Sequence, residues 1–217
     1  MTEPIAAGRD ADVFALDDDR VLRRYRDETD DTTAEAVIMR YVAGYGYPVP
    51  EVFEASGPDL VMTRVDGPTM AEAMVRGEMT IAGGAAMLAD LLARLHAIPV
   101  PPGRDGEAIL HLDLHPENVL VTAAGPTVID WCNAGTGRAD RDTALSALIM
   151  AQLAIGSIPH PLASSAGEFL DRFLQLAPGD PLRGLDAALE MRRNDRATTP
   201  DELAALPAAA ARVRPGR

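Results

Sequence analysis

Three side chains that carry oxygen donors stand at a defined spacing near the middle of the chain. Asp113 is followed five residues later by Asn118 and twelve residues after that by Asp130. Phosphoryl transfer needs a carboxylate that orients the attacking hydroxyl and accepts its proton, and separate oxygen ligands that hold Mg²⁺ on the phosphates. Asp113 suits the first task, and Asn118 and Asp130 suit the second because Mg²⁺ prefers oxygen ligands. We therefore predict Asp113 as the catalytic carboxylate and Asn118 and Asp130 as the metal ligands.

The residues around Asp113 form a recognisable motif. Residues 109–120 read ILHLDLHPENVL, and residues 128–131 read VIDW. The order His-x-Asp-x-x-x-x-Asn, then a short β turn and a further Asp, is typical of the catalytic loop of protein kinases and their relatives. The segment resembles the aminoglycoside phosphotransferase family, whose loop typically reads His-Gly-Asp-Leu-His-Pro-x-Asn. Judged by the order of the motifs, the resemblance extends over roughly residues 5–150.

The resemblance implies an enzyme that uses ATP and Mg²⁺ to phosphorylate a hydroxyl group of a small molecule. It also implies that His111 belongs to the catalytic site by bracing the loop through hydrogen bonds. It does not identify the acceptor, for which an aminoglycoside-like or other cationic alcohol is one candidate. A different class of function stays open as well: a catalytically weak nucleotide-binding regulatory module that retains the kinase-like fold.

The first part of the chain contains the residues that the resemblance assigns to the nucleotide phosphates. By position, residues 8–12 would form the phosphate loop around Gly8, Arg23 would be the basic residue of the next strands, and Glu35 would be its partner on the following helix. Side chains alternate along a strand, so Arg24 should point away from the face that carries Arg23. The loop has one glycine rather than several, and Arg replaces the usual Lys, so the predicted affinity for ATP is modest.

Several of these residues have structural alternatives. Thr32 and Glu35 also fit a capping box, in which Glu35 would reach back to its own helix start. Arg23 could be a solvated strand residue. Thr63 and Val65 end a strand that resembles the family's hinge, where backbone groups bind adenine, but they also fit a core strand that ends in a turn.

Hydrophobic periodicity places these residues on strands in the first part of the chain and on helices in the second. We predict an α+β, bilobal, protein-kinase-like fold, with a small β-rich N-lobe over residues 1–65 and a mainly helical, shortened C-lobe over residues 66–217. The expected strands are residues 12–16, 20–25, 51–55, 60–65, 119–122 and 127–129, and the expected helices are residues 32–43, 69–75 and 82–96, with further helices after residue 140.

Composition narrows the range of partners. The net charge of −13 repels polyanions, so we expect no nucleic acid partner. The most apolar stretch, residues 144–158, is interrupted by polar residues and falls short of the roughly 20 apolar residues that span a bilayer, so it predicts a buried helix and no membrane association. No secretory signal begins the sequence, which predicts a cytoplasmic protein. Cys132 is the only cysteine, which excludes an internal disulfide, and we expect it to be buried.

Acidic residues after the motif are candidates for two further tasks. Asp142 could be the buried acid that the family uses to brace its catalytic loop, with Asp140 as the competing candidate. Acids further along the chain could meet a cationic substrate, although they also fit solvated helix faces. These are Asp171, Asp180, Asp186 and Glu190.

Overall fold

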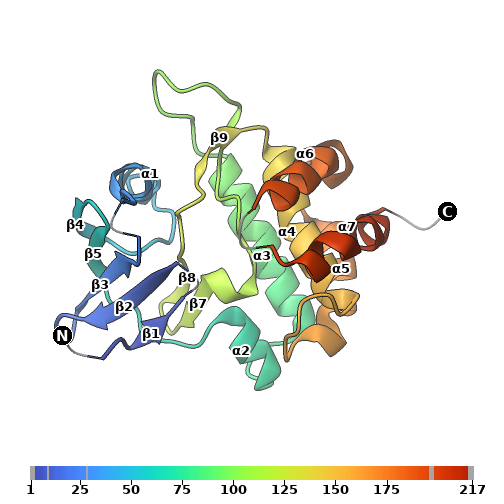
Figure 1. Ribbon diagram of the computed structural model, residues 1–217, viewed down its shortest axis with the longest axis horizontal. Helices are drawn as coiled ribbons and strands as arrows, with labels where there is room; N and C mark the ends of the chain where they lie inside the picture. The colour runs from blue at the N-terminus through green and yellow to red at the C-terminus, as the bar shows by residue number, and fades with distance from the viewer. Residues whose placement is uncertain (1–2, 9, 28, 196–197, 215–217) are drawn as a thin grey trace.

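The computed structural model describes residues 3–8, 10–27, 29–195 and 198–214. An antiparallel sheet with one helix is built from the first part of the chain, and a larger body of helices follows (Figure 1). The predicted α+β class is therefore confirmed. In the described part of the chain, no helix combines the length and apolar character needed to cross a membrane.

The sheet has five antiparallel strands in the order β1-β2-β3-β5-β4. The turn between β2 and β3 forms because the Asp17 carboxylate accepts hydrogen bonds from the backbone N–H groups of Asp19 and Arg20. β3 lies between β2 and β5, with Arg23 opposite Val13 on one side and Leu60 on the other. The strands are β1 (Ala6–Ala7), β2 (Ala11–Ala15), β3 (Arg20–Tyr25), β4 (Val52–Ser56) and β5 (Asp59–Thr63).

Helix α1 (Thr33–Ala43) begins one residue later than predicted and carries a buried apolar face. Ala36, Met39 and Val42 recur at three-residue steps, which places them on one side of the helix. This side packs toward the sheet and contacts β4. The helix therefore holds its first turn, which contains Glu35, against the inner face of the sheet.

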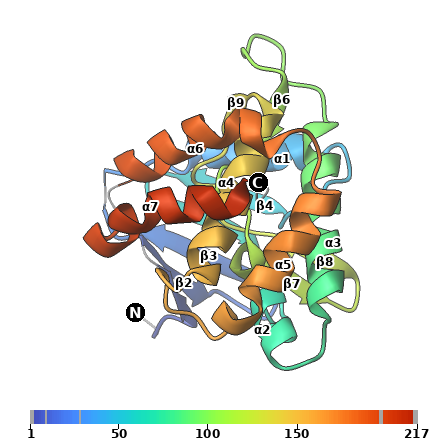
Figure 2. The same cartoon turned by 90° about the vertical axis from the view of Figure 1, so that its right-hand side faces the viewer.

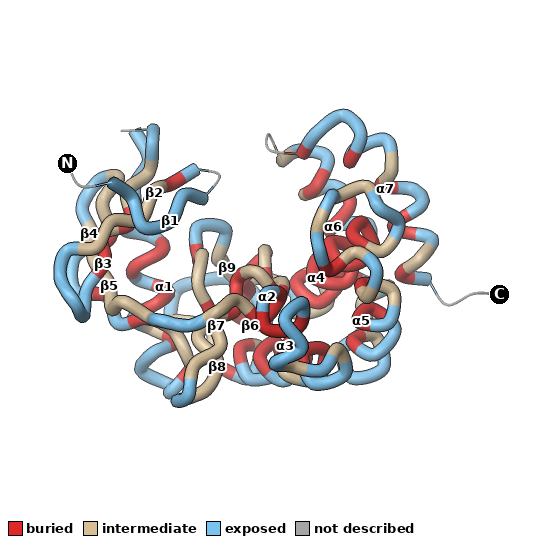
Figure 3. Tube along the Cα trace, turned by 90° about the horizontal axis from the view of Figure 1, so that it is seen from below, coloured by how far each residue is buried: buried red, intermediate tan, exposed pale blue. Residues whose placement is uncertain are grey.

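Most of the remaining helices contact α4 (Ala139–Ala154), in which every residue from Asp142 to Leu153 is buried. Figure 2 shows α5, α6 and α7 around it, and Figure 3 shows that buried segments concentrate there. The apolar stretch at residues 144–158 is thus a buried helix for most of its length, as predicted. The other helices are α2 (Met70–Val75), α3 (Ile81–His96), α5 (Ala163–Leu176), α6 (Pro181–Asn194) and α7 (Pro200–Val213).

Two small antiparallel pairs of strands position the motif. β7 (Val119–Thr122) pairs with β8 (Gly125–Val128), close to the predicted strands, and η1 (Pro116–Asn118) precedes β7. A second pair, β6 (Ala108–Leu110) with β9 (Gly135–Gly137), was not predicted. This pairing brings the two ends of the segment 111–134 together, and that segment contains Asp113, Asn118 and Asp130.

Candidate active site

The loop that carries Asp113 is fixed by a buried carboxylate. Asp142 is fully buried, and its two oxygens accept hydrogen bonds from the backbone N–H groups of His111 at 2.9 Å and Leu112 at 2.7 Å. Nε2 of His96, at the end of α3, lies 3.0 Å from the same carboxylate. Leu112 has a φ of 63°, in the left-handed region that non-glycine residues adopt at a cost. Asp142 therefore braces the loop and holds its strained residue, whereas Asp140 contacts the start of α6 instead.

His111 lies behind the loop and is fully buried. Its Nε2 is 3.0 Å from the carbonyl oxygen of Ile129, and because a carbonyl can only accept, Nε2 carries the hydrogen. The ring also meets Trp131 edge-on, with centroids 4.8 Å apart. His111 thus ties the Asp113 loop to the residue before Asp130, which fits the bracing role and not a contact with substrate.

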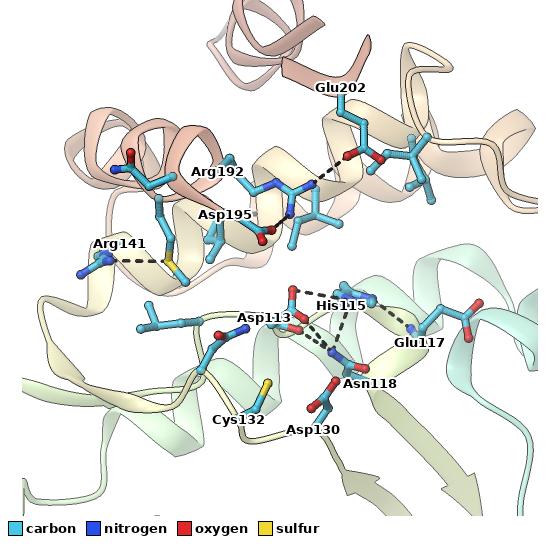
Figure 4. A pocket seen from close by; sticks show the side chains of 18 of the residues that line it. Asp113, His115, Glu117, Asn118, Asp130, Cys132, Arg141, Arg192, Asp195 and Glu202 are labelled. Atoms are coloured by element: carbon cyan, nitrogen blue, oxygen red, sulfur yellow. Dashed lines mark hydrogen bonds and ion pairs between the residues drawn. The ribbon is translucent and has the colours of Figure 1, made fainter. Parts of the chain in front are cut away.

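Asp113, which precedes η1, lies next to Asn118, the last residue of η1. Nδ2 of Asn118 donates to the backbone oxygen of Asp113 at 2.8 Å and lies 3.3 Å from its carboxylate (Figure 4). His115 stands on the other side, with Nε2 3.7 Å from Oδ1 of Asp113. Burial raises the pKa of Asp113, but the hydrogen bond and charge of His115, together with His111 and Arg192, outweigh it, so the pKa is lowered. Asp113 is therefore held as a carboxylate.

Arg23 joins the sheet to Asp130, the second residue after β8. Its guanidinium lies 2.6 Å from Oε1 and 2.7 Å from Oε2 of Glu35, and its other nitrogen lies 3.0 Å from Oδ1 of Asp130. Glu35 also accepts a hydrogen bond from the backbone N–H of Trp131 at 3.2 Å. Burial disfavours the charge on Arg23, but the two carboxylates outweigh this effect and raise its pKa. Arg23, Glu35 and Asp130 therefore form one connected group.

These contacts decide two alternatives that the sequence left open. Glu35 does not form the capping box, because its carboxylate binds Arg23 and the hydroxyl of Thr32 donates to carbonyl oxygens near β5 instead. Arg23 is buried and is not a solvated strand residue. Arg24 points to the opposite face and pairs with Asp59 near the surface, as the strand alternation predicted.

A cleft of about 870 Å³ runs from the loop before β2 to the catalytic loop and on to the last helices. Gly8 lines it, and Arg9, within the predicted phosphate loop, lies outside the described residues. Thr63 and Val65 do not line it, and the N–H of Thr63 donates to the carbonyl of Glu51 within the sheet region. The structure thus brings Gly8 together with Asp113, Asn118 and Asp130, but leaves the predicted adenine contacts outside this cleft.

Much of the far side of the cleft comes from residues that sequence reasoning missed. Cys132 was expected to be buried, but it is exposed and lines the cleft. Of the acids proposed for a cationic substrate, Glu190 alone lines the cleft among the described residues, whereas Asp171 pairs with Arg212 and Asp180 caps α6. The helical wall otherwise consists of residues that no local motif marks: Arg141, Leu145, Ile149, Leu153, Ala187, Met191, Arg192, Asn194, Asp195 and Glu202.

The donor set fits Mg²⁺ carried on a nucleotide. Asn118 uses its Nδ2 for Asp113, which leaves its amide oxygen for a cation, and the Asp130 side chain is 38% exposed beside it. No cluster of three or more His, Cys, Asp or Glu side chains in the described residues could hold a metal ion alone. An Mg²⁺ ion bound by one or two protein ligands plus phosphate oxygens is the usual arrangement in phosphoryl-transfer sites.

Comparison with known proteins bears on the family and on the fold. The model of the phosphotransferase enzyme family matches residues 2–108, so the match ends just before the motif at residues 109–120. No curated protein sequence gives a significant match. Solved structures with the same fold do match, and those described next share 11–16% sequence identity with this chain.

Three solved structures illustrate the likeness. The amicoumacin kinase hAmiN, in complex with AMP-PNP, Ca²⁺ and Ami, has a TM-score of 0.54 at 16% identity, over 96% of this chain and 86% of that one. The streptomycin-ATP-APH(2″)-IIa ternary complex gives a TM-score of 0.59 at 15% identity, over 88% and 82%. The ethanolamine kinase of Plasmodium vivax gives a TM-score of 0.56 at 11% identity, over 97% and 76%.

The family match and the structural matches both lead to phosphotransferases and small-molecule kinases. The family match covers the sheet, α1, α2 and α3, and the solved structures cover the helical body as well. Residues 2–108 match the phosphotransferase enzyme family, and the chain has the kinase-like fold of these solved structures, in line with the family that the motif around Asp113 predicted.

Proposed function

We propose that the protein transfers the γ-phosphate of ATP, with Mg²⁺, to a hydroxyl group of a small molecule. The observation that carries this proposal is the convergence of Asp113, Asn118 and Asp130 on one cleft whose other end is lined by Gly8. The solved structures with this fold include complexes with ATP or AMP-PNP, which supports the same nucleotide here.

Each residue has a distinct task in this proposal. The Asp113 carboxylate orients the acceptor hydroxyl and takes its proton, and the Nδ2 of Asn118 keeps the Asp113 backbone in place. The oxygens of Asn118 and Asp130 hold the metal, which when bound neutralises charge on the phosphates. Arg23, oriented by Glu35, supplies a positive charge at the phosphate side of Asp130.

The acceptor has to enter from the helical side of the cleft. Residues of α4, α6 and α7 line that side, and in Figure 1 these helices lie across the molecule from the five-stranded sheet. Proteins of this fold include kinases for aminoglycosides and for ethanolamine, which agrees with a small hydroxylated acceptor. The proposal therefore specifies a hydroxyl group within a cleft of limited volume and not a protein substrate.

A pair of isosteric variants tests this division of labour. Asp113→Asn should abolish transfer and leave Mg²⁺-ATP binding nearly intact, because the amide cannot accept the hydroxyl proton. Asp130→Asn should weaken Mg²⁺-ATP binding as well, because the cation loses a negative ligand. The measurements are ADP release with a library of hydroxylated compounds and calorimetric titration with Mg²⁺-ATP.

Two results would count against the proposal. If Asp113→Asn kept most of the activity, or if both variants lost nucleotide binding equally, the assigned roles would be wrong. If the wild-type protein bound Mg²⁺-ATP but transferred phosphate to no compound, the regulatory nucleotide-binding module would be the better description.

A further inference from the structure

Arg141 is the one arginine lining the cleft, within the described residues, that has no carboxylate partner. The other, Arg192, lies 3.0 Å from Asp195 and 3.8 Å from Glu202. The polar partner of the Arg141 guanidinium is the Met191 sulfur at 3.5 Å, which is a weak acceptor. Its Nε is buried and finds no acceptor in the described part of the chain. A buried donor without a hydrogen-bond partner lowers the stability of the fold, so its presence needs a physical explanation.

The position of Arg141 in its helix does not supply that reason. It stands in the first turn of α4, where the helix dipole disfavours a positive charge and favours the neighbouring acids Asp140 and Asp142. Arg138, three residues earlier, lies near Glu107 and Asp140 at the surface, so the same turn offers acidic partners that Arg141 does not use. Arg141 instead points into the cleft beside α6.

A single buried contact places Arg141 close to the catalytic loop. Asp142, the residue after Arg141, accepts the hydrogen bond of Leu112, the residue before Asp113. Arg141 and Asp113 both line the cleft, and each is the direct sequence neighbour of one partner in this 2.7 Å hydrogen bond. In Figure 4, Arg141 and the metal-site residue Asn118 appear on opposite sides of Asp113. A ligand that reaches Arg141 would thus extend away from the proposed nucleotide.

We propose that Arg141 binds an anionic oxygen group, a carboxylate or a phosphate, of the phosphate acceptor. The inference rests on the proposed function, and it defines the acceptor as an alcohol that carries a negative charge. A carboxylate or phosphate would accept from the Nε and terminal nitrogens of Arg141, which matches its forked donor geometry. Leu145, one helical turn further along α4, also lines the cleft and would contact the carbon skeleton between the two ends.

Glu190 also lines this cleft and would repel an anion. Its side chain is exposed, however, so solvent and salt screen its charge, whereas the donor of Arg141 is buried. The acids Asp195 and Glu202 are already engaged by Arg192. The local balance at Arg141 therefore favours an anion, even though the protein as a whole is acidic.

The test compares acceptors that differ in one charge. Glycolate and hydroxyhexanoate are each paired with their neutral amides, and glycerol phosphate is paired with glycerol, so that the series also separates carboxylate from phosphate. Binding is measured by saturation-transfer NMR with Mg²⁺ and a non-hydrolysable ATP analogue, and transfer is measured as ADP release. Arg141→Gln is compared with wild type and with Arg138→Gln, the matched surface control.

We expect at least one acid to bind about tenfold or more tightly than its neutral counterpart, because charge-assisted hydrogen bonds are the strong ones. Arg141→Gln should remove this difference, whereas Arg138→Gln should retain it, with both variants folded by circular dichroism. Transfer to glycerol or to the neutral amides with no preference for the acids would overturn the inference and leave the proposed function standing. Acids that bind through Arg141 but never accept phosphate would show an anion site that does not serve the acceptor, which would also overturn the inference. If in addition no neutral compound accepted phosphate, the proposed function would fail as well.

Discussion

Replacing Arg23 with methionine should destabilise the protein far more than the same change at Arg24. The Arg23 and Glu35 side chains are 10% and 5% exposed, and removing one partner of a buried ion pair costs about 3–5 kcal/mol. Glu35 would keep hydrogen bonds from Tyr25 and Trp131, which places the expected loss near the lower end, at about 3 kcal/mol. The Arg24–Asp59 pair is 41% and 33% exposed, and such surface pairs contribute about 0–1 kcal/mol.

Urea unfolding followed by circular dichroism gives the two free energies of unfolding by linear extrapolation. The double variant Arg23→Met, Glu35→Met should recover part of the loss, because it removes the uncompensated buried charge. Calorimetry should in addition show weaker Mg²⁺-ATP binding for Arg23→Met and unchanged binding for Arg24→Met. Equal losses of stability at the two positions, or a larger loss at Arg24, would refute the strand register and the buried network derived from it.

Three further outcomes are expected. ATP should bind weakly without Mg²⁺ and more tightly with it, because Asp130 would otherwise face phosphate charge unscreened; equal calorimetric affinities would exclude metal bridging. Asp142→Asn should lower the free energy of unfolding by about 2–4 kcal/mol and remove most of the activity, because an amide offers one acceptor oxygen to two buried backbone donors. The control Asp186→Asn, at an exposed position, should change neither quantity in the same urea unfolding and turnover assays. The pKa of Asp113 is lowered in the folded state, so its stabilising contribution should be complete above the usual carboxylate pKa of ~3.9 and should be lost as the pH falls from there through the lowered value. An acid limb of kcat/KM at or above pH ~3.9 would contradict this.

The local motif was sufficient to locate the centre of the candidate site. Asp113, Asn118 and Asp130 are linked by short-range geometry, because a turn of η1 and the β7–β8 hairpin bring them together within one small unit. Alternation along β3 likewise predicted that Arg23 and Arg24 face opposite ways, since that property belongs to any strand. The α+β class followed from periodicity in the same manner.

Tertiary structure decided the features that depend on partners far apart in the chain. The Glu35 pattern fitted a capping box equally well, and only the approach of β3 and Trp131 determines that its carboxylate binds Arg23. The three-residue strands β6 and β9 were missed because strands so short have no detectable period and pair across residues 111–134.

The helical wall of the cleft shows the same limit. The spacing of Arg141 and Leu145 marks one helix face, but sequence cannot say whether that face meets solvent, another helix or a cleft. The packing of α6 against α4 decides this, because it buries most of α4 and places Arg141 beside Met191, with no carboxylate partner among the residues that the structure describes. The residues of the continuous motif could therefore be predicted from the sequence. The residues that separate helices contribute to the cleft could not, because their burial and charge pairing depend on contacts between distant segments.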